Sequence, residues 1–167
     1  MHHPDDLIRL FEQCFLQSHQ TILAYGTDEP VYLPANEGQP CHTIFFAHGF
    51  FSSALHECAH WLIAGKARRV LEDYGYWYIP DGRDADQQAL FQQVEVKPQA
   101  LEWVLSKAAG YRFQLSVDNL NGDVTGAEDF QAAVAQQVRC YEQQGLPPRA
   151  QRFHQALLRH YQGLEMT

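Results

Sequence analysis

The chain has 167 residues, of which 46% are hydrophobic and 13% aromatic, within the range of one globular domain. An excess of acidic residues gives a formal net charge of −8, which argues against a nucleic-acid-binding surface. We therefore expect one domain over residues 1–167 whose partners are proteins or small molecules.

The start of the chain and its cysteines indicate a cytoplasmic protein that does not enter membranes. The sequence begins Met-His-His-Pro-Asp-Asp, without the basic and apolar regions of a signal peptide. No stretch approaches the roughly eighteen uninterrupted apolar residues of a membrane helix. The cysteines are scattered, without a Cys-x-x-Cys pair, which favours reduced thiols over a disulfide framework or a zinc cluster. They are Cys14, Cys41, Cys58 and Cys140.

The first half of the chain is predicted to contain a helix and two short strands ahead of a central helix. Apolar residues at helical spacing predict an amphipathic helix over residues 5–18. Residues 31–33 and 43–47 are short runs typical of strands, and a loop rich in Pro, Asn and Gly separates them. The aromatic run 74–79 predicts a third strand. We expect an α+β fold, mostly helical, in which a small antiparallel sheet of these strands packs against the central helix.

The second half is predicted to be largely helical. A helical pattern runs from Asp84 to Gly110, and Pro98 interrupts it. Because proline removes a backbone donor, we expect a kink or a break near residues 94–97. Residues 111–117 are predicted to be a strand or an extended segment. Two closing helices are expected over residues 127–143 and 149–161.

The apolar run 51–65 carries a His-Glu-x-x-His motif. Residues four apart lie on one face of a helix, so the imidazoles of His56 and His60 can converge on one metal ion. Apolar residues nearly all round them predict a helix buried on most sides, which Ser52 or Ser53 could cap. We interpret the motif as a metal site, the alternative being two hydrogen-bonded core histidines.

Two imidazoles leave a metal ion under-coordinated, so a third protein ligand is needed. We choose Glu95, because the distorted backbone expected before Pro98 could aim its side chain inward. Glu102 is the second choice, on a regular helical turn where a solvent-facing carboxylate is the simpler interpretation. The other acidic candidates downstream are Asp73, Asp81 and Asp84.

Two chemistries share this set of ligands. With zinc, Glu57 would act as the general base of a metallopeptidase of the His-Glu-x-x-His plus Glu type. With iron(II), two histidines and one carboxylate leave positions open for dioxygen and substrate, as in an oxygenase. The spacing alone does not choose between them.

Seven separated blocks of sequence follow one another between residues 28 and 101. They are Asp28–Ala35, Phe46–Phe50, the His-Glu-x-x-His motif, Ala64–Arg69, Tyr76–Tyr78, Pro80–Ala85 and Val94–Leu101. Together they resemble the bacterial elongation factor P hydroxylase family. Seven blocks in order are far more specific than the metal motif alone.

The resemblance implies a non-haem hydroxylase of the iron monooxygenase type. Its substrate would be the lysine of elongation factor P to which another enzyme has attached a β-lysyl group. The resemblance places the metal ligands on His56, His60 and Glu95. Fe(II) is the expected metal, with zinc or another divalent ion as an alternative in isolated protein, and dioxygen is the expected co-substrate.

The resemblance also changes the role expected of residues near the ligands. Glu57 becomes a residue that orients a ligand or relays a proton. His48, just before the central helix, is either a supporting residue of the same kind or a core histidine at a strand end. Neither a Rossmann glycine fingerprint nor an identifiable 2-oxoglutarate arginine points to the electron donor, and nothing in the sequence indicates an oligomeric state.

Overall fold

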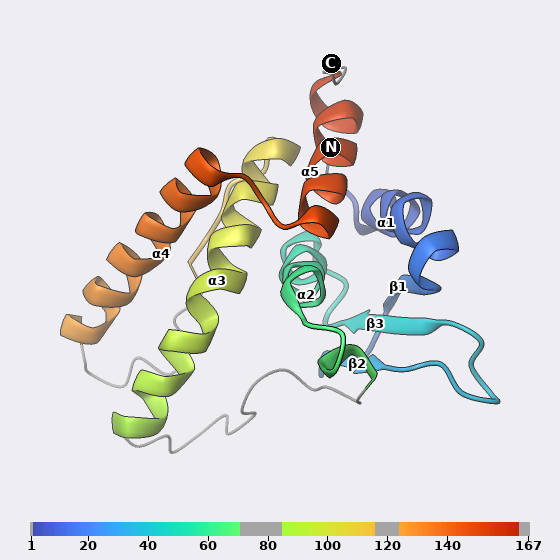
Figure 1. The fold of residues 1–167 in the computed structure, drawn as a ribbon, viewed down its shortest axis with the longest axis horizontal. Helices are drawn as coiled ribbons and strands as arrows, with labels where there is room; N and C mark the ends of the chain where they lie inside the picture. Colours follow the sequence, from blue (N-terminus) through green and yellow to red (C-terminus); the bar gives the residue numbers. More distant parts are fainter. Residues whose placement is uncertain (1, 71–84, 116–123, 164–167) are drawn as a thin grey trace.

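The computed structural model describes residues 2–70, 85–115 and 124–163, with the backbone alone for residues 68, 85–93 and 124–127. Helices and strands follow one another as the sequence predicts in outline, and the mostly helical α+β fold is confirmed (Figure 1). The elements are α1 (Pro4–His19), β1 (Thr21–Tyr25), β2 (Val31–Leu33), β3 (His42–Phe46), α2 (Phe51–Ile63), a 3-10 turn (Arg68–Val70), α3 (Ala85–Ala109), α4 (Val124–Gln144) and α5 (Pro148–Gln162).

The sheet is mixed, so the prediction of an antiparallel sheet is wrong for one of its two pairings. β3 lies in the middle, parallel to β1 and antiparallel to β2. β1 starts directly after Gln20, whose left-handed backbone ends α1, and it was not predicted although Thr21, Ile22 and Tyr25 are residues that favour strands. The strand predicted over residues 74–79 lies outside the described residues.

α3 is one continuous helix, so of the predicted kink or break near residues 94–97 the break does not occur. Pro98 lies inside it and is buried. Proline removes one intrahelical hydrogen bond. α3 also packs against α2, α4 and α5, and this packing maintains the helix across the missing bond.

The N-terminal cap of α2 also differs from the prediction. Phe50 is the N-cap and makes no side-chain cap hydrogen bond, so neither Ser52 nor Ser53 caps the helix. At the other end Ala64 is the C-cap. The helix begins in the turn after β3, and its position follows from packing more than from a local cap signal.

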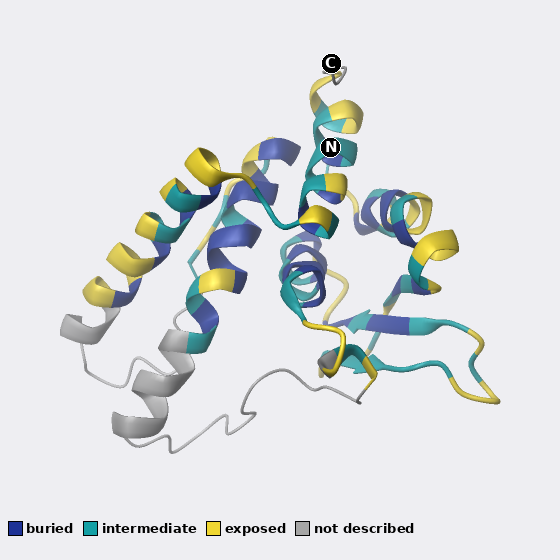
Figure 2. Ribbon diagram, viewed as in Figure 1, coloured by how far each residue is buried: buried dark blue, intermediate teal, exposed yellow. Residues whose placement is uncertain are grey.

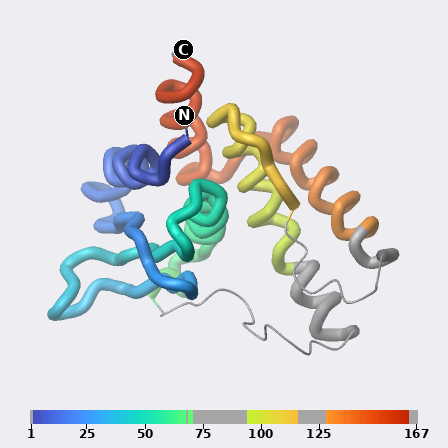
Figure 3. Tube along the Cα trace, turned by 180° about the vertical axis from the view of Figure 1, so that it is seen from behind, coloured from blue at the N-terminus to red at the C-terminus, as the bar shows by residue number. Residues whose placement is uncertain are grey.

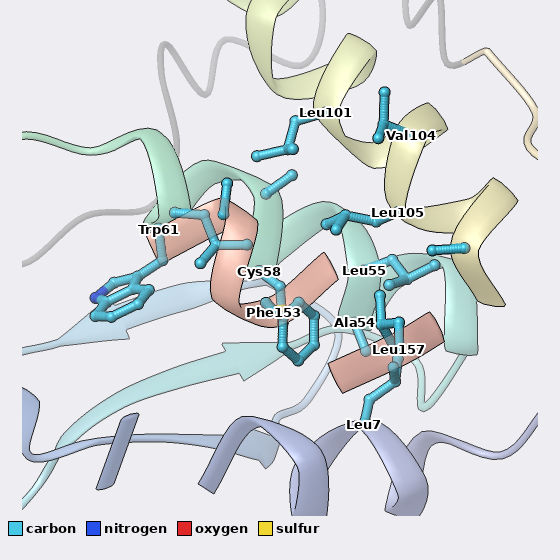
Figure 4. Packing of buried hydrophobic residues seen from close by; sticks show 14 of the residues in the cluster. Leu7, Ala54, Leu55, Cys58, Trp61, Leu101, Val104, Leu105, Phe153 and Leu157 are labelled. Atoms are coloured by element: carbon cyan, nitrogen blue, oxygen red, sulfur yellow. The ribbon is translucent and has the colours of Figure 1, made fainter. Parts of the chain in front are cut away.

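α2 occupies the centre of the fold. Seen from both sides, α1 and the sheet lie to one side of it, and α3 and α4 lie to the other (Figures 1 and 3). Figure 2 shows buried residues on α2 and on the helices that surround it. Figure 4 shows this core, in which α2 meets side chains of α1, α3 and α5. The labelled residues are Leu7, Ala54, Leu55, Cys58, Trp61, Leu101, Val104, Leu105, Phe153 and Leu157.

The structure also tests the predictions for the two closing helices, for residues 111–115 and for the cysteines. The two closing helices are confirmed, with α4 and α5 slightly longer than predicted. Residues 111–115 form no strand. All four cysteines are free thiols, as expected. Among the described residues, no helix is both long and apolar enough to cross a membrane.

Candidate metal centre

Two packed helices supply the polar side chains of the candidate site. On α2, His56, Glu57 and His60 are half-buried in an otherwise apolar helix. On α3, a stripe of polar residues recurs at helical spacing and is buried among apolar neighbours. This stripe consists of Glu95, Gln99, Glu102 and Ser106. Because α2 and α3 pack together, the histidines meet the acidic residues of the stripe.

The two histidines and Glu95 converge on one point. The Nε2 atoms of His56 and His60 lie 3.1 Å apart. The carboxylate oxygens of Glu95 lie 3.5 Å from Nε2 of His56 and 3.0 Å from Nε2 of His60. One potential ligand atom from each of the three residues lies within 4.8 Å of the others. His56 and His60 lie on α2 and Glu95 lies on α3, and the sequence does not show directly that these two helices are in contact.

This geometry fits a metal ion. Ligand atoms about 2.1 Å from one ion, at angles between octahedral and tetrahedral values, lie about 3.0–3.4 Å from each other. The two Nε2 atoms are 3.1 Å apart, Oε2 of Glu95 is 3.0 Å from Nε2 of His60, and its Oε1 is 3.5 Å from Nε2 of His56, so each contact falls in or next to that range. Oε2 of Glu95 is buried and has no hydrogen-bond partner among the described residues, although His60 is near. A buried carboxylate whose two oxygens each face an imidazole nitrogen is well suited to a divalent cation.

Electrostatics couple the three groups strongly. Burial opposes charge on both sides, but the opposite charges in contact outweigh it. Burial alone would lower the pKa of His56, yet its hydrogen bonds to Glu102 and Glu95 raise that pKa well above its ordinary value. Burial alone would raise the pKa of Glu95, yet the two histidines hold it below its ordinary range. Glu95 is therefore an ionised carboxylate at neutral pH, as a metal ligand must be.

Glu102 does not join this group but contacts the other side of His56. Its Oε1 lies 2.6 Å from Nδ1 of His56, and the residue is only 6% exposed. The expectation that Glu102 faces solvent is therefore wrong, because its turn of α3 packs on α2. The regular spacing of the polar stripe was the sequence signal that could have placed Glu102 on the same helix face as Glu95.

The remaining candidate residues include Glu57, next to His56 on α2, and three aspartates. Glu57 is half-buried; desolvation, together with Glu95 and Glu102, raises its pKa against the opposing effect of the histidines. Asp73, Asp81 and Asp84, the other candidate ligands, lie outside the described residues.

His48 is on the surface. It is exposed, has a left-handed backbone with φ of 59°, and its Nδ1 lies 3.8 Å from a carboxylate oxygen of Asp28. Its ring also contacts Phe50. The expectation of a core histidine is wrong, and within the described part of the chain none of its contacts is with His56, His60 or Glu95. It follows two residues after β3 ends, where the chain turns outward before α2.

The fold and this group of side chains are those of a candidate metal-dependent enzyme built on packed helices. Comparison with known proteins identifies its family. Residues 10–167 match the family EpmC, described as elongation factor P hydroxylase. The chain is also 54% identical over 160 residues to the elongation factor P lysine hydroxylase of Haemophilus influenzae, covering 96% of this chain and 90% of that protein. The chain belongs to the elongation factor P hydroxylase family. Neither comparison supports the peptidase alternative.

Proposed function

We propose that this protein hydroxylates the modified lysine side chain of elongation factor P at a divalent metal centre held by His56, His60 and Glu95. The observation that carries the proposal is the convergence of these three side chains within 4.8 Å in a chain of this family. The named activity of the relative from Haemophilus influenzae supports the choice of substrate.

Two histidines and one carboxylate are the protein ligands of many non-haem iron(II) oxygenases. Iron(II) held by this set would supply the activation of dioxygen that hydroxylation of a lysine carbon requires. We therefore favour iron over zinc, and dioxygen as co-substrate, with a separate electron donor. The overall reaction is a monooxygenation in which one oxygen atom enters the side chain and the other is reduced to water by two electrons from that donor.

The chain's own residues would prepare the site for this reaction. The Nε2 atoms of His56 and His60 and the carboxylate of Glu95 would bind the ion on one side, leaving its other side to substrate. Glu57, one residue after His56, would orient a ligand or relay a proton. Leu55, Cys58 and Leu62, all buried on the same helix, would hold both histidines rigidly.

The substrate has properties that suit the protein's overall charge. A β-lysylated lysine is long and cationic, whereas the chain carries a formal charge of −8. Acidic excess of this kind favours the approach of a cationic side chain. Because the substrate is a translation factor, we place the reaction in the cytoplasm.

The test is the state of elongation factor P in cells that lack the endogenous enzyme. Cells expressing the wild-type chain should yield elongation factor P with the added oxygen atom, measured by mass spectrometry of the intact protein. His60→Ala should lose it, because one of three ligands is absent. His160→Ala, an exposed histidine of α5, is the matched control and should retain it. Full hydroxylation with His60→Ala would refute the proposed site.

A further inference from the structure

We propose that Glu102 is a positioning residue, whose carboxylate accepts a hydrogen bond from Nδ1–H of His56 and so holds Nε2 of that ring toward His60 and Glu95. This inference rests on the proposed metal centre. It assigns a role to a residue that binds neither the metal nor the substrate.

The first support is the geometry around His56. Nδ1 of the ring lies 2.6 Å from Oε1 of Glu102, while Nε2 lies 3.1 Å from Nε2 of His60. The two nitrogens of an imidazole point in different directions, so a carboxylate on Nδ1 cannot reach an ion bound at Nε2. Glu102 therefore orients the ring, and a hydrogen bond at Nδ1 leaves the lone pair of Nε2 for the metal.

The second support is the burial of Glu102. The residue is 6% exposed, and an ionised carboxylate so far from water is costly unless it is hydrogen-bonded. Within the part of the chain that the structure describes, its hydrogen-bond partner is His56. The hydrogen bond with His56 therefore offsets part of the cost of burying this carboxylate.

The third support is the placement of both acids on one rigid helix. Glu95 and Glu102 lie two turns apart on α3, so they share one face. Glu95 meets the Nε2 side of His56 and Glu102 meets the Nδ1 side. The ring is therefore held from both sides by a single element, and a rotation of the imidazole would break contacts with both acids.

The test uses cobalt(II) as the probe, because its visible absorption reports coordination directly. Glu102→Gln and Glu102→Met are a matched pair: both are neutral and similar in size to Glu, but only Gln keeps an oxygen acceptor for Nδ1–H. Loss of such a supporting partner typically weakens metal binding by about 10–100-fold. We expect a loss of this size for Glu102→Met and a smaller one for Glu102→Gln. Glu12→Gln, an exposed residue of α1, should bind cobalt as the wild type does.

A second readout follows the hydrogen bond itself. In zinc-loaded protein labelled with nitrogen-15 at histidine, NMR should show a slowly exchanging Nδ1–H proton on His56. The proton should persist in Glu102→Gln and exchange rapidly in Glu102→Met. If Glu102→Met does not fold without metal, the Glu102→Gln spectrum alone decides, because loss of the proton there would overturn the inference.

The variants also separate this inference from the proposed site. Equal cobalt affinity of wild type and Glu102→Met, with binding lost in His56→Ala, would overturn only the role of Glu102. An equal loss in Glu102→Gln and Glu102→Met would also overturn it, since the acceptor would not matter. Normal cobalt binding by His56→Ala would instead refute the metal centre.

Discussion

The guanidinium of Arg149 binds the C-terminal end of α2, the helix that carries both histidines, and contacts Trp61 there. Nη1 of Arg149 lies 2.6 Å from the carbonyl oxygen of Trp61, and Nη2 lies 2.6 Å from that of Ala64. The guanidinium carbon also lies 4.5 Å from the centroid of the Trp61 ring. The carbonyl of Trp61 also accepts a shared hydrogen bond from the backbone N–H of Ala64, and the guanidinium of α5 adds charged donors at this end, so it caps α2 through tertiary contact.

Replacing Arg149 should destabilise the fold. Burial and the nearby charge of Arg69 lower the pKa of Arg149 to about 10, so it remains charged at neutral pH. Arg149→Met removes the charged donors of two hydrogen bonds, and we expect the free energy of unfolding to fall by about 1–3 kcal/mol. Arg149→Lys keeps the charge but not the planar fork, so its loss should be intermediate. Urea denaturation measures both; equal stability of Arg149→Met and wild type would contradict the capping role.

Metal binding should stabilise the protein through Glu95. A ligand at a concentration 100 times its Kd stabilises the folded state by about 2.7 kcal/mol. We therefore expect zinc to raise the melting temperature of wild type and a chelator to reverse the rise. Glu95→Gln should show little of this response, because the amide is a poor substitute for the buried carboxylate. A full zinc-dependent rise in Glu95→Gln, followed by circular dichroism, would exclude Glu95 as a ligand.

Gly26 follows β1 and lies against β3, whereas Gly65 follows α2 and has open space around it. Replacing each by alanine should therefore change the stability of the protein differently. A Cβ atom on Gly26 would lie 3.0 Å from both Cβ of Phe45 and the carbonyl oxygen of Phe46. Because part of this obstacle is backbone, Gly26→Ala should destabilise the protein by about 1–3 kcal/mol.

Gly65→Ala is the matched control, since nothing lies within 4 Å of a Cβ added there. It should be neutral or stabilise by up to about 1 kcal/mol, because alanine restricts the unfolded chain. Denaturant titration of both variants measures these changes in the free energy of unfolding. Equal effects of the two substitutions would show that the close approach of β3 does not limit the size of the residue at position 26.

His154 should make the protein less stable in acid. Its Nδ1 is buried without a hydrogen-bond partner among the described residues, and burial lowers its pKa below the ordinary 6.5. The unfolded chain therefore binds the proton more readily, so this contribution to stability is complete above pH 6.5. It is lost as the pH falls through 6.5 toward the lower pKa of the folded state.

His154→Leu should remove this contribution. Its unfolding free energy should fall less steeply than that of wild type between about pH 7 and 5. Urea denaturation at a series of pH values measures the two slopes. Parallel slopes would show that His154 is not protonated differently in the two states.

Local patterns in the sequence were sufficient to predict the main helices, the pair of histidines and the family. Helical periodicity predicted the helices, and four-residue spacing placed His56 and His60 on one face, because both are properties of a single helix. Seven blocks in order indicated the family. Glu95 is predicted as the third ligand because Pro98 lies close to it in the sequence; α3 runs through Pro98 without a break, and Glu95 does meet the histidines.

Only the tertiary structure decided how the separate elements meet. The parallel pairing of β1 with β3 joins strands that are distant in sequence, and α3 stays helical through Pro98 because it is packed against three other helices. The contact of Glu102 with Nδ1 of His56 depends on which face of α3 meets α2. Spacing within one helix sets which side chains share a face, whereas the partner of that face follows from packing of the whole core.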